Sequence, residues 1–408
     1  MCKVGYMISF SEAVDIINNN SMGVELGVEK VALEDSVGRI CAVDVYSKIN
    51  IQPFDNSAMD GFGVGLEDLK LASKGNPIVL KKVAEVSAGQ KNNLDMLLKS
   101  GECIHIMTGA PVVSGVEAVV PIELVDIKGS QVFFCDTPEN GANIRRAGED
   151  IKQGDLLLQK GSVLKVTDIL PLASAGVAKV DVFKKPKVLL ITTGDELVTD
   201  LNKNLDLGEI YNSNFYYMNA WLIGKGCEVI HVNMPDSKET FKGKLLEHLP
   251  SVDMIVSSGA VSAGVHDFVK GSLLDLKAEI LYHKVKMRPG KPNLLAKLPN
   301  GVLYFGLPGN PVASSVGLQF FVQTALDALQ CSLTNAHRQM PLLNSFTKKK
   351  GFSLFLKAIV HENAVEIMEG QASFQTKPFL NMNAWVALPE TGDDALKPGD
   401  MVKVYPIL

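Results

Sequence analysis

The feature that most constrains the fold is the alternation of apolar and helix-like segments in the second half of the chain. Apolar runs at residues 188–192, 227–232 and 252–256 are separated by segments whose apolar residues recur with helical spacing. Apolar strands that alternate with helices of roughly 10–15 residues indicate a parallel sheet with helices on both faces. We therefore expect a doubly wound α/β domain over residues 181–330.

Loops with special residues follow the predicted strands of this domain. They cover residues 193–196, 235–236, 257–267 and 306–311. In a parallel sheet, ligands bind beyond the carboxyl ends of the strands, so these loops are expected to converge on one edge. The loop at 257–267 has the small residues and hydroxyls that cradle anions, and Arg288 and Lys291 follow on a proline-containing turn. The sequence therefore predicts a site for a strongly negative small molecule.

The rest of the chain predicts three smaller parts. Residues 1–48 and 146–180 have too little apolar surface to fold alone and are expected to form a mixed α+β scaffold layer, which begins with a helix capped by Ser9 and Glu12. Residues 49–145 contain short apolar runs between Gly and Pro residues, which predicts an inserted, mostly β domain. Residues 331–408 alternate like strands and predict a small C-terminal β domain, similar to a barrel.

The composition restricts the classes of partner. The chain has 408 residues, of which 46% are hydrophobic and 21% charged, and a net charge of −5, so a nucleic-acid partner is not expected. Its six cysteines are scattered without a CxxC pair, which fits reduced thiols and gives no support to a zinc site. With neither a signal-peptide pattern nor an apolar run of about 18 residues, we expect a cytoplasmic protein without a membrane partner.

The inserted domain carries two polar stretches that either form turns or bind a ligand. Residues 53–61 bring Asp55, Asn56, Ser57 and Asp60 close together in sequence. Residues 107–111 end a predicted strand, where Thr108 offers a hydroxyl. Asp-Asn-Ser and Asp-Gly sequences are also ordinary turn formers, so the two interpretations are about equally good for each stretch.

Taken together, these motifs resemble the molybdopterin molybdenumtransferase family, which includes MoeA and the E domains of gephyrin and its plant counterpart. The segments that carry the resemblance are residues 53–61, 107–111, 143–150, 193–197, 257–270, 287–292 and 306–311. The resemblance covers essentially the whole chain, and it is specific because the motifs are long and occur in the right order. It implies an insertase that transfers molybdate into adenylylated molybdopterin and releases AMP with the help of Mg²⁺, which yields molybdenum cofactor.

The resemblance also implies an assembly and partners. The expected assembly is a homodimer in which the inserted domain of one subunit closes over the sheet of the other. Transient contacts with the molybdopterin adenylyltransferase and with molybdoenzyme acceptors are expected as well. Two other functions stay open: an adenylyltransferase that modifies molybdopterin, whose fold is similar to the central domain, and a non-catalytic pterin-binding scaffold.

The resemblance assigns roles residue by residue. The catalytic residues would be Asp60, Thr108, Glu196 and Asp267. The pocket for the pterin nucleotide would be formed by Ser257, Gly259, Ser262, Pro308, Gly309, Asn310 and Pro311. Molybdate would contact Arg288, Lys291, Lys357 and Ser373. Asp236 and Asp267 would hold the Mg²⁺ ion.

Each assignment has a plainer alternative, and several positions depart from the family pattern. Glu196 could cap a helix, and Pro308 and Pro311 could serve only to shape the backbone. Ala260 stands where the family usually has glycine, and Arg288 where it usually has lysine. Lys357 replaces the usual arginine, and Phe374 follows Ser373 in place of glycine.

Overall fold

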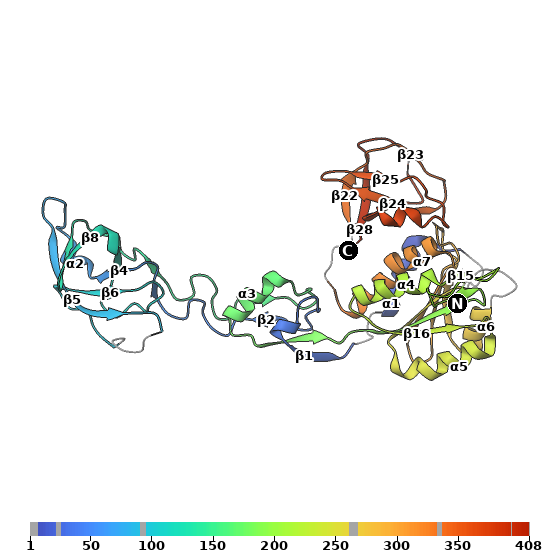
Figure 1. Cartoon of the computed structure of the whole chain (residues 1–408), viewed down its shortest axis with the longest axis horizontal. Coiled ribbons are helices and arrows are strands. Elements are labelled where there is room, and N and C mark those ends of the chain that lie inside the picture. The colour runs from blue at the N-terminus through green and yellow to red at the C-terminus, as the bar shows by residue number, and fades with distance from the viewer. Residues whose placement is uncertain are drawn as a thin grey trace.

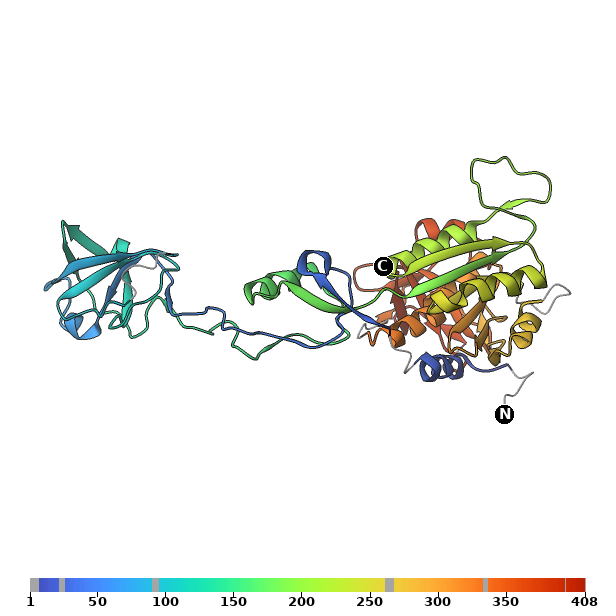
Figure 2. The ribbon, with the colours of Figure 1, turned by 90° about the horizontal axis from the view of Figure 1, so that it is seen from below.

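The computed structural model describes residues 7–21, 26–89, 95–260, 268–332, 337–392 and 394–407. The molecule is elongated (Figure 1). A β domain lies at one end, the α/β domain and the C-terminal β domain lie at the other, and a narrow middle part joins them (Figure 1 and Figure 2). The chain runs out to the distal β domain and back through this middle part before it forms the α/β domain.

The α/β domain contains a six-stranded sheet in the order β16-β13-β17-β21-β20-β18. Its parallel strands are β16 Glu228–Met234, β13 Lys187–Thr193, β17 Met254–Ser258 and β21 Leu303–Leu307. β20 Leu294–Lys297 runs antiparallel between β21 and β18 Glu279–His283. The expected sheet is confirmed, with β20 as an antiparallel strand that the sequence analysis did not predict.

Helices cover both faces of this sheet. α5 Lys238–His248 and α6 Phe268–Asp275 pack on one face, where Phe241 and Leu273 contact strand residues. The other face carries α4 Ser213–Gly224 and a long helix. That helix consists of α7 Pro311–Gly317, a π-helical turn Leu318–Val322 and α8 Gln323–Leu329.

The long helix Pro311–Leu329 has the length and apolar composition of a membrane-spanning helix, but 72% of its most apolar window is buried inside the protein. Val316, Phe321 and Leu326 belong to the main apolar core. A helix that is apolar all round is expected where it is buried on all sides, so its composition follows from its place in the core.

The first helix, α1 Phe10–Ser21, begins with the predicted capping box. The Ser9 N–H donates to the Glu12 carboxylate (2.8 Å), and the Glu12 N–H donates to the Ser9 hydroxyl (3.2 Å). Through Ala13 and Ile17, α1 packs on the core of the α/β domain, although the range 1–48 had been assigned to the scaffold. The domain boundaries at 48, 145, 180 and 330 stay predictions.

The middle part is built from two distant stretches of chain. β1 Val28–Ala32 pairs antiparallel with β12 Lys179–Phe183, and β2 Val45–Tyr46 pairs with β11 Leu156–Leu158. α3 Val166–Ser174 packs on them around a small core that includes Leu172. This is the mixed α+β layer that the sequence predicted.

The distal domain is mostly β, as expected for an insertion. Its six-stranded sheet has the order β7-β4-β6-β5-β9-β8. The strands are β4 Gly61–Val64, β5 Ile78–Val86, β6 Glu102–Ile106, β7 Ala118–Pro121, β8 Val125–Lys128 and β9 Gln131–Phe134. A short helix, α2 Leu66–Leu69, covers the core. β3 Asn56–Ser57 pairs with β10 Ile144–Arg145 at the junction with the middle part.

The C-terminal domain is also a β domain, as expected. Its main sheet has the order β19-β24-β26-β28-β22, and β25 pairs with β24. The strands are β19 Met287–Arg288, β22 Arg338–Pro341, β24 Ser353–Val360, β25 Val365–Ile367, β26 Ala384–Leu388 and β28 Met401–Pro406. β23 Phe346–Thr347 and β27 Ala395–Leu396 form a separate pair. Because β19 contains Arg288 and pairs with β24, the segment that carries Arg288 is part of this sheet.

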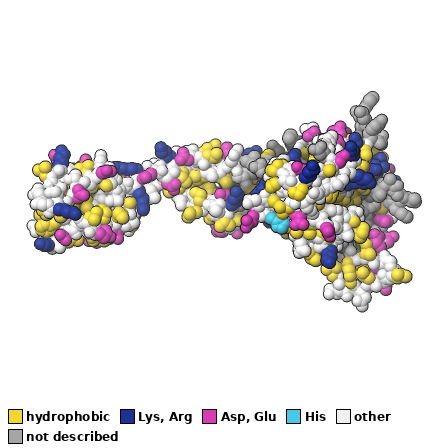
Figure 3. All heavy atoms as spheres, turned by 90° about the horizontal axis from the view of Figure 1, so that it is seen from above, with side chains coloured by type: hydrophobic (Ala, Val, Ile, Leu, Met, Phe, Trp, Pro, Cys, Tyr) yellow, Lys and Arg dark blue, Asp and Glu magenta, His cyan; other side chains and the backbone are white. Residues whose placement is uncertain are grey.

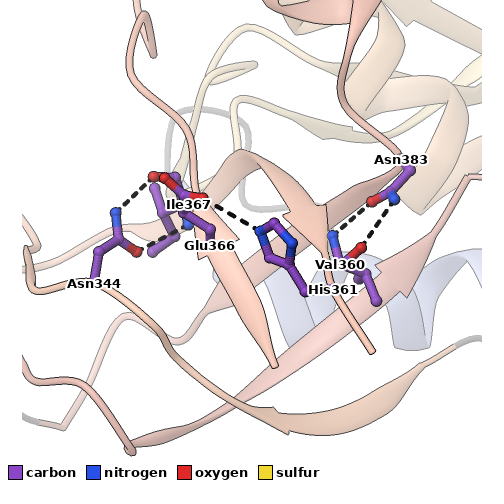
Figure 4. Close-up of polar contacts among 6 residues, drawn as sticks. All are labelled: Asn344, Val360, His361, Glu366, Ile367 and Asn383. Atoms are coloured by element: carbon purple, nitrogen blue, oxygen red, sulfur yellow. Dashed lines mark hydrogen bonds and ion pairs between the residues drawn. The ribbon is translucent and has the colours of Figure 1, made fainter. Parts of the chain in front are cut away.

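Asparagine side chains complete backbone pairing in the C-terminal sheet (Figure 4). The Asn344 amide donates to the Ile367 carbonyl (2.8 Å), and its oxygen accepts from the Ile367 N–H (3.0 Å). The Asn383 oxygen accepts from the Val360 N–H (2.7 Å) in the same way. These bonds satisfy strand ends that would otherwise lack partners.

Candidate functional site

The loops after β17 and β21 lie together at the carboxyl edge of the sheet, as expected. Asn214, in the first turn of α4, donates to the Ser258 hydroxyl (2.7 Å) and to the Gly309 carbonyl (2.8 Å). The Gly259 N–H donates to the Leu307 carbonyl (3.2 Å). One amide side chain therefore connects the two loops in which the sequence analysis placed the pterin pocket.

The backbone at Gly259 requires glycine. Its φ is +100°, and a Cβ there would lie 2.7 Å from the Thr193 hydroxyl oxygen and 2.8 Å from the Thr193 carbonyl oxygen. The next residue, Ala260, also has a positive φ, +49°. An alanine in the left-handed region is strained, so the departure noted in the sequence falls where glycine would fit better.

The hydroxyls of Ser257 and Ser258 point in different directions, because successive side chains of a strand alternate between the faces of the sheet. Ser257 is fully buried, and its hydroxyl accepts from the Tyr304 hydroxyl in the core (2.5 Å). Ser258 instead accepts from Asn214 at the loop edge. The Ser258 hydroxyl also donates to the Pro308 carbonyl (3.3 Å), so it links the two loops, and the role of Ser257 in the pterin pocket stays a prediction.

A partly buried polar network adjoins this edge. The Thr192 hydroxyl donates to Asn233 (3.0 Å) and accepts from Asn212 (2.9 Å). His231 Nε2 lies 3.0 Å from the same oxygen and, since the hydroxyl proton is already used, donates to it. Phe215 stacks on the His231 ring, and burial lowers the pKa of His231 to about 4, so the ring is neutral near pH 7.

Carboxylates follow the first two strands at this edge. Glu196 and Asp236 are exposed, and the Asp236 N–H donates to the Asp195 carboxylate (3.4 Å), so these two loops adjoin. Within the described ranges, no group of three or more His, Cys, Asp or Glu side chains is arranged to hold a metal ion. Mg²⁺ usually needs only one or two protein carboxylates beside phosphate and water, so the donors at this edge suit it. Ser262 and Asp267 lie outside the described residues.

The predicted molybdate-binding cations lie on the 287–292 loop and on β24, which pair through β19. The Arg288 guanidinium lies over the Phe352 ring at 4.3 Å, and Arg288 is paired with Leu354 through β19 and β24. Lys357 lies further along β24 and is fully buried. Lys291 is exposed and follows on the same loop as Arg288. The ion pairs of the described ranges include none of these three cations.

The Lys357 ammonium has neutral partners. It donates to the carbonyls of Ala372 (3.3 Å) and Gln375 (3.0 Å), and burial lowers the pKa of its side chain. Ser373 lies in the loop between these carbonyls, and its hydroxyl accepts from the Asn310 amide (3.2 Å). The structure thus brings Lys357, Ser373 and the 306–311 loop, which is the predicted pterin loop, together at one junction.

Asp60 and Thr108 meet in the distal domain. The Thr108 N–H and hydroxyl both donate to the same Asp60 oxygen, each at 2.7 Å. The bond from the Thr108 N–H, helped by that from its hydroxyl, holds the pKa of Asp60 below its usual value. Nearby, Arg146 forms an ion pair with Asp55 (2.6 Å), which joins two of the sequence motifs.

Within one chain, the distal pair and the sheet edge do not meet. Asp60 and Thr108 belong to the domain at one end of the molecule, whereas Glu196, Asp236 and the pterin loops belong to the α/β domain at the other (Figure 1). This separation is compatible with the expected homodimer, in which the inserted domain of one subunit closes over the sheet of the other.

Asn214 is a further candidate site residue that was not expected from the sequence. The residue lies directly after the predicted strand-to-helix loop, in the first turn of a predicted helix. Asparagine in the first turn is common for capping, and its neighbour Asn212 does act as the N-cap. From its position in the sequence, Asn214 could therefore not be distinguished from an ordinary helix-capping residue.

One well-formed cavity lies away from these residues. It has a volume of about 670 Å³ and lies between α1 and the C-terminal domain, where it is lined by Phe10, Phe355 and Tyr405 among others. None of the candidate site residues lines it. Cavity size alone therefore does not identify the site.

Comparisons with known proteins agree with these features. Residues 8–176 match the MoeA N-terminal region (domain I and II), and residues 189–328 match a probable molybdopterin binding domain. A molybdopterin molybdenumtransferase from Synechococcus elongatus is 33% identical over 98% of this chain and 99% of its own length. One from Haemophilus influenzae is 36% identical over 74% of this chain and 73% of its own length.

A solved structure is similar over the whole length. The crystal structure of the molybdopterin biosynthesis moeA protein from Pyrococcus horikoshii OT3 is 26% identical, with a TM-score of 0.84. The match covers 98% of this chain and 100% of that one. The multidomain arrangement expected from the sequence is therefore that of a known fold.

Proposed function

Because this chain belongs to the molybdopterin molybdenumtransferase family of molybdenum cofactor biosynthesis, we propose that it inserts molybdate into adenylylated molybdopterin and releases AMP. The observation that carries this proposal is the junction of the pterin loop with Lys357 and Ser373. Two anionic substrates need donors and cations on adjacent surfaces, and this junction offers both.

In this proposal the edge loops bind the pterin nucleotide. The walls of the pocket are formed by Ser258, Gly259 and the loop from Pro308 to Pro311. Asn214 connects the two sides through its hydrogen bonds to Ser258 and Gly309. Arg288, Lys291 and Lys357 attract molybdate, and Ser373 contacts it. Asp236 and Asp267 would hold Mg²⁺, which offsets charge on the phosphate that is cleaved. Glu196 lies at the same edge and would be a catalytic residue in the cleavage that releases AMP.

We also propose that the active unit is a homodimer. Asp60 and Thr108 can take part only if a second copy brings its distal domain over the sheet edge. The middle part has exposed apolar side chains, including Tyr46 (50%), Leu156 (51%), Val166 (74%) and Leu170 (75%). Hydrophobic side chains show on the surface of this part in Figure 3. An apolar surface of this kind marks a protein contact, and a second copy is the partner that would complete the site.

A cytoplasmic location is part of the proposal. Five cysteines are free in the described ranges, and Cys41, Cys103 and Cys227 among them are buried. Free thiols are typical of a reducing compartment. There the enzyme would receive its substrate from an adenylyltransferase and pass the cofactor to molybdoenzymes.

The test measures AMP release from adenylylated molybdopterin with Mg²⁺, with and without molybdate. We expect molybdate-dependent release by the parent protein and a loss of at least a hundredfold in Glu196→Gln, on the scale of a removed catalytic group. Leu246→Asp, at an exposed position on α5, is the matched surface control and should retain activity. If the parent instead transferred AMP from ATP to molybdopterin, the adenylyltransferase alternative would replace this proposal. If it bound the pterin without turnover, a scaffold role would replace it.

A further inference from the structure

Asn310 connects the pterin loop of the α/β domain with the Ser373 loop of the C-terminal domain. Its amide nitrogen donates to the Ser373 hydroxyl at 3.2 Å. The other amide atom, Oδ1, is buried and has no hydrogen-bond partner in the described part of the chain. A buried amide oxygen without a partner costs free energy, so the bond to the Ser373 hydroxyl is the polar contact that favours this orientation of the side chain.

The direction of this bond determines what Ser373 can do. A serine hydroxyl has one proton and two lone pairs. Because the Asn310 amide occupies a lone pair, the proton of the Ser373 hydroxyl stays available for another acceptor. The hydrogen bonds of the described residues give that proton none. Ser373 is half-buried, so a bound ligand can reach it.

The surroundings favour an anion as that acceptor. Lys357 is buried, no carboxylate among the described residues pairs with it, and its ammonium donates to the carbonyls of Ala372 and Gln375, on either side of Ser373. A buried ammonium that has only neutral acceptors leaves positive charge at this junction. An oxyanion that accepted the Ser373 proton would offset this charge.

The loop that carries Ser373 is held firmly on its other side. Gln371 accepts from the Lys357 N–H (3.0 Å) and donates to the carbonyls of Lys357 (2.9 Å) and Met368 (2.8 Å). The loop therefore cannot rotate freely, and the orientation of the Ser373 hydroxyl depends on its partner Asn310.

We propose that Asn310 is a positioning residue that turns the Ser373 hydroxyl into a donor for molybdate. Through this bond, the loop that binds the pterin nucleotide also sets the geometry of the oxyanion site. The inference rests on the proposed function, since it deepens the role of the same junction.

The test measures the dissociation constant of molybdate by calorimetry on the full-length protein, and the KM for molybdate in AMP release. A hydrogen bond to a charged group contributes about 1.5–3 kcal/mol, so Ser373→Ala should weaken molybdate binding about tenfold to a hundredfold. Asn310→Ala should weaken it by a smaller factor, and the double variant should match Ser373→Ala, because Asn310 acts through Ser373. Asn310→Asp should weaken binding most, since its carboxylate takes the serine proton and repels the anion.

Asn383→Ala is the matched control, because that asparagine bonds only backbone groups in the same domain (Figure 4). It should leave the molybdate dissociation constant unchanged. Unchanged molybdate binding in Asn310→Ala, or additive losses in the double variant, would overturn the inference while leaving the proposed function intact. AMP release by the parent protein that does not depend on molybdate would instead overturn the proposed function.

Discussion

At the scale of single residues, substitutions at the neighbours Gly259 and Ala260 should have opposite effects on the stability of the α/β domain. Ala260 has φ +49°, where a Cβ costs about 1–2 kcal/mol. Part of this is offset because glycine gains entropy in the unfolded chain, so Ala260→Gly should stabilise the α/β domain by about 0.5–1 kcal/mol. Gly259→Ala should destabilise it by about 2 kcal/mol or more, since the new Cβ would meet the Thr193 backbone.

Both changes can be measured as shifts in the thermal transition of this domain by calorimetry. The pair serves as its own control, because both variants alter one methyl group in the same loop. A destabilised Ala260→Gly variant would show that this alanine is not strained.

Other residues show why some side chains could not be assigned from the sequence. A loop was expected from residue 257, but β17 continues through Ser258, and which of Ser257 and Ser258 faces the core depends on the register of this strand. The Tyr304 hydroxyl on β21 donates a hydrogen bond to the Ser257 hydroxyl, and Tyr304 is distant from Ser257 in sequence. The role of Asn310 was likewise invisible, because Ser373 comes from another domain.

At the scale of elements, the strand ends depend on a neutral His231. Burial lowers its pKa to about 4, from about 6.5 for an exposed histidine. Between these values the unfolded chain binds the proton more readily than the folded one, so folding is destabilised as the pH falls from 6.5 towards 4. The stability from neutral His231 is fully present above pH 6.5.

The measurement compares unfolding of the parent protein and His231→Gln from pH 7 to pH 4. The parent should lose more stability over this interval, because glutamine does not titrate. Carboxylates titrate in both proteins, so their contribution cancels in the comparison. Equal losses in the two proteins would contradict a neutral, half-buried His231.

The elements themselves were largely predictable. Periodicity identified the strands β13, β16 and β17 and the helices α4, α5 and α6. β20 was missed because its four residues, Leu294–Lys297, follow a turn and lie close to the next apolar run. Four residues are too few to show a period of two, and the partner strands β18 and β21 decide the direction.

At the scale of the whole molecule, the two groups of candidate catalytic residues lie far apart. The motifs in the inserted domain and those in the α/β domain were recognised together from the sequence, but one chain holds them at opposite ends (Figure 1). Sequence patterns show which motifs a chain contains, but they do not show whether the motifs that form one site come from the same chain or from two chains. The resemblance to a dimeric family was the only signal for this.

The most direct test of the account is complementation between two inactive variants. Asp60→Asn removes the carboxylate of the distal half-site, and Glu196→Gln removes that of the sheet edge. The two chains are co-expressed with different tags, and AMP release is measured on the mixture. In a random mixture half of the dimers are mixed, and each mixed dimer has one site with neither change, so activity should return to about a quarter of the parent level. No recovery, although mixed dimers are isolated, would contradict a site shared between two chains.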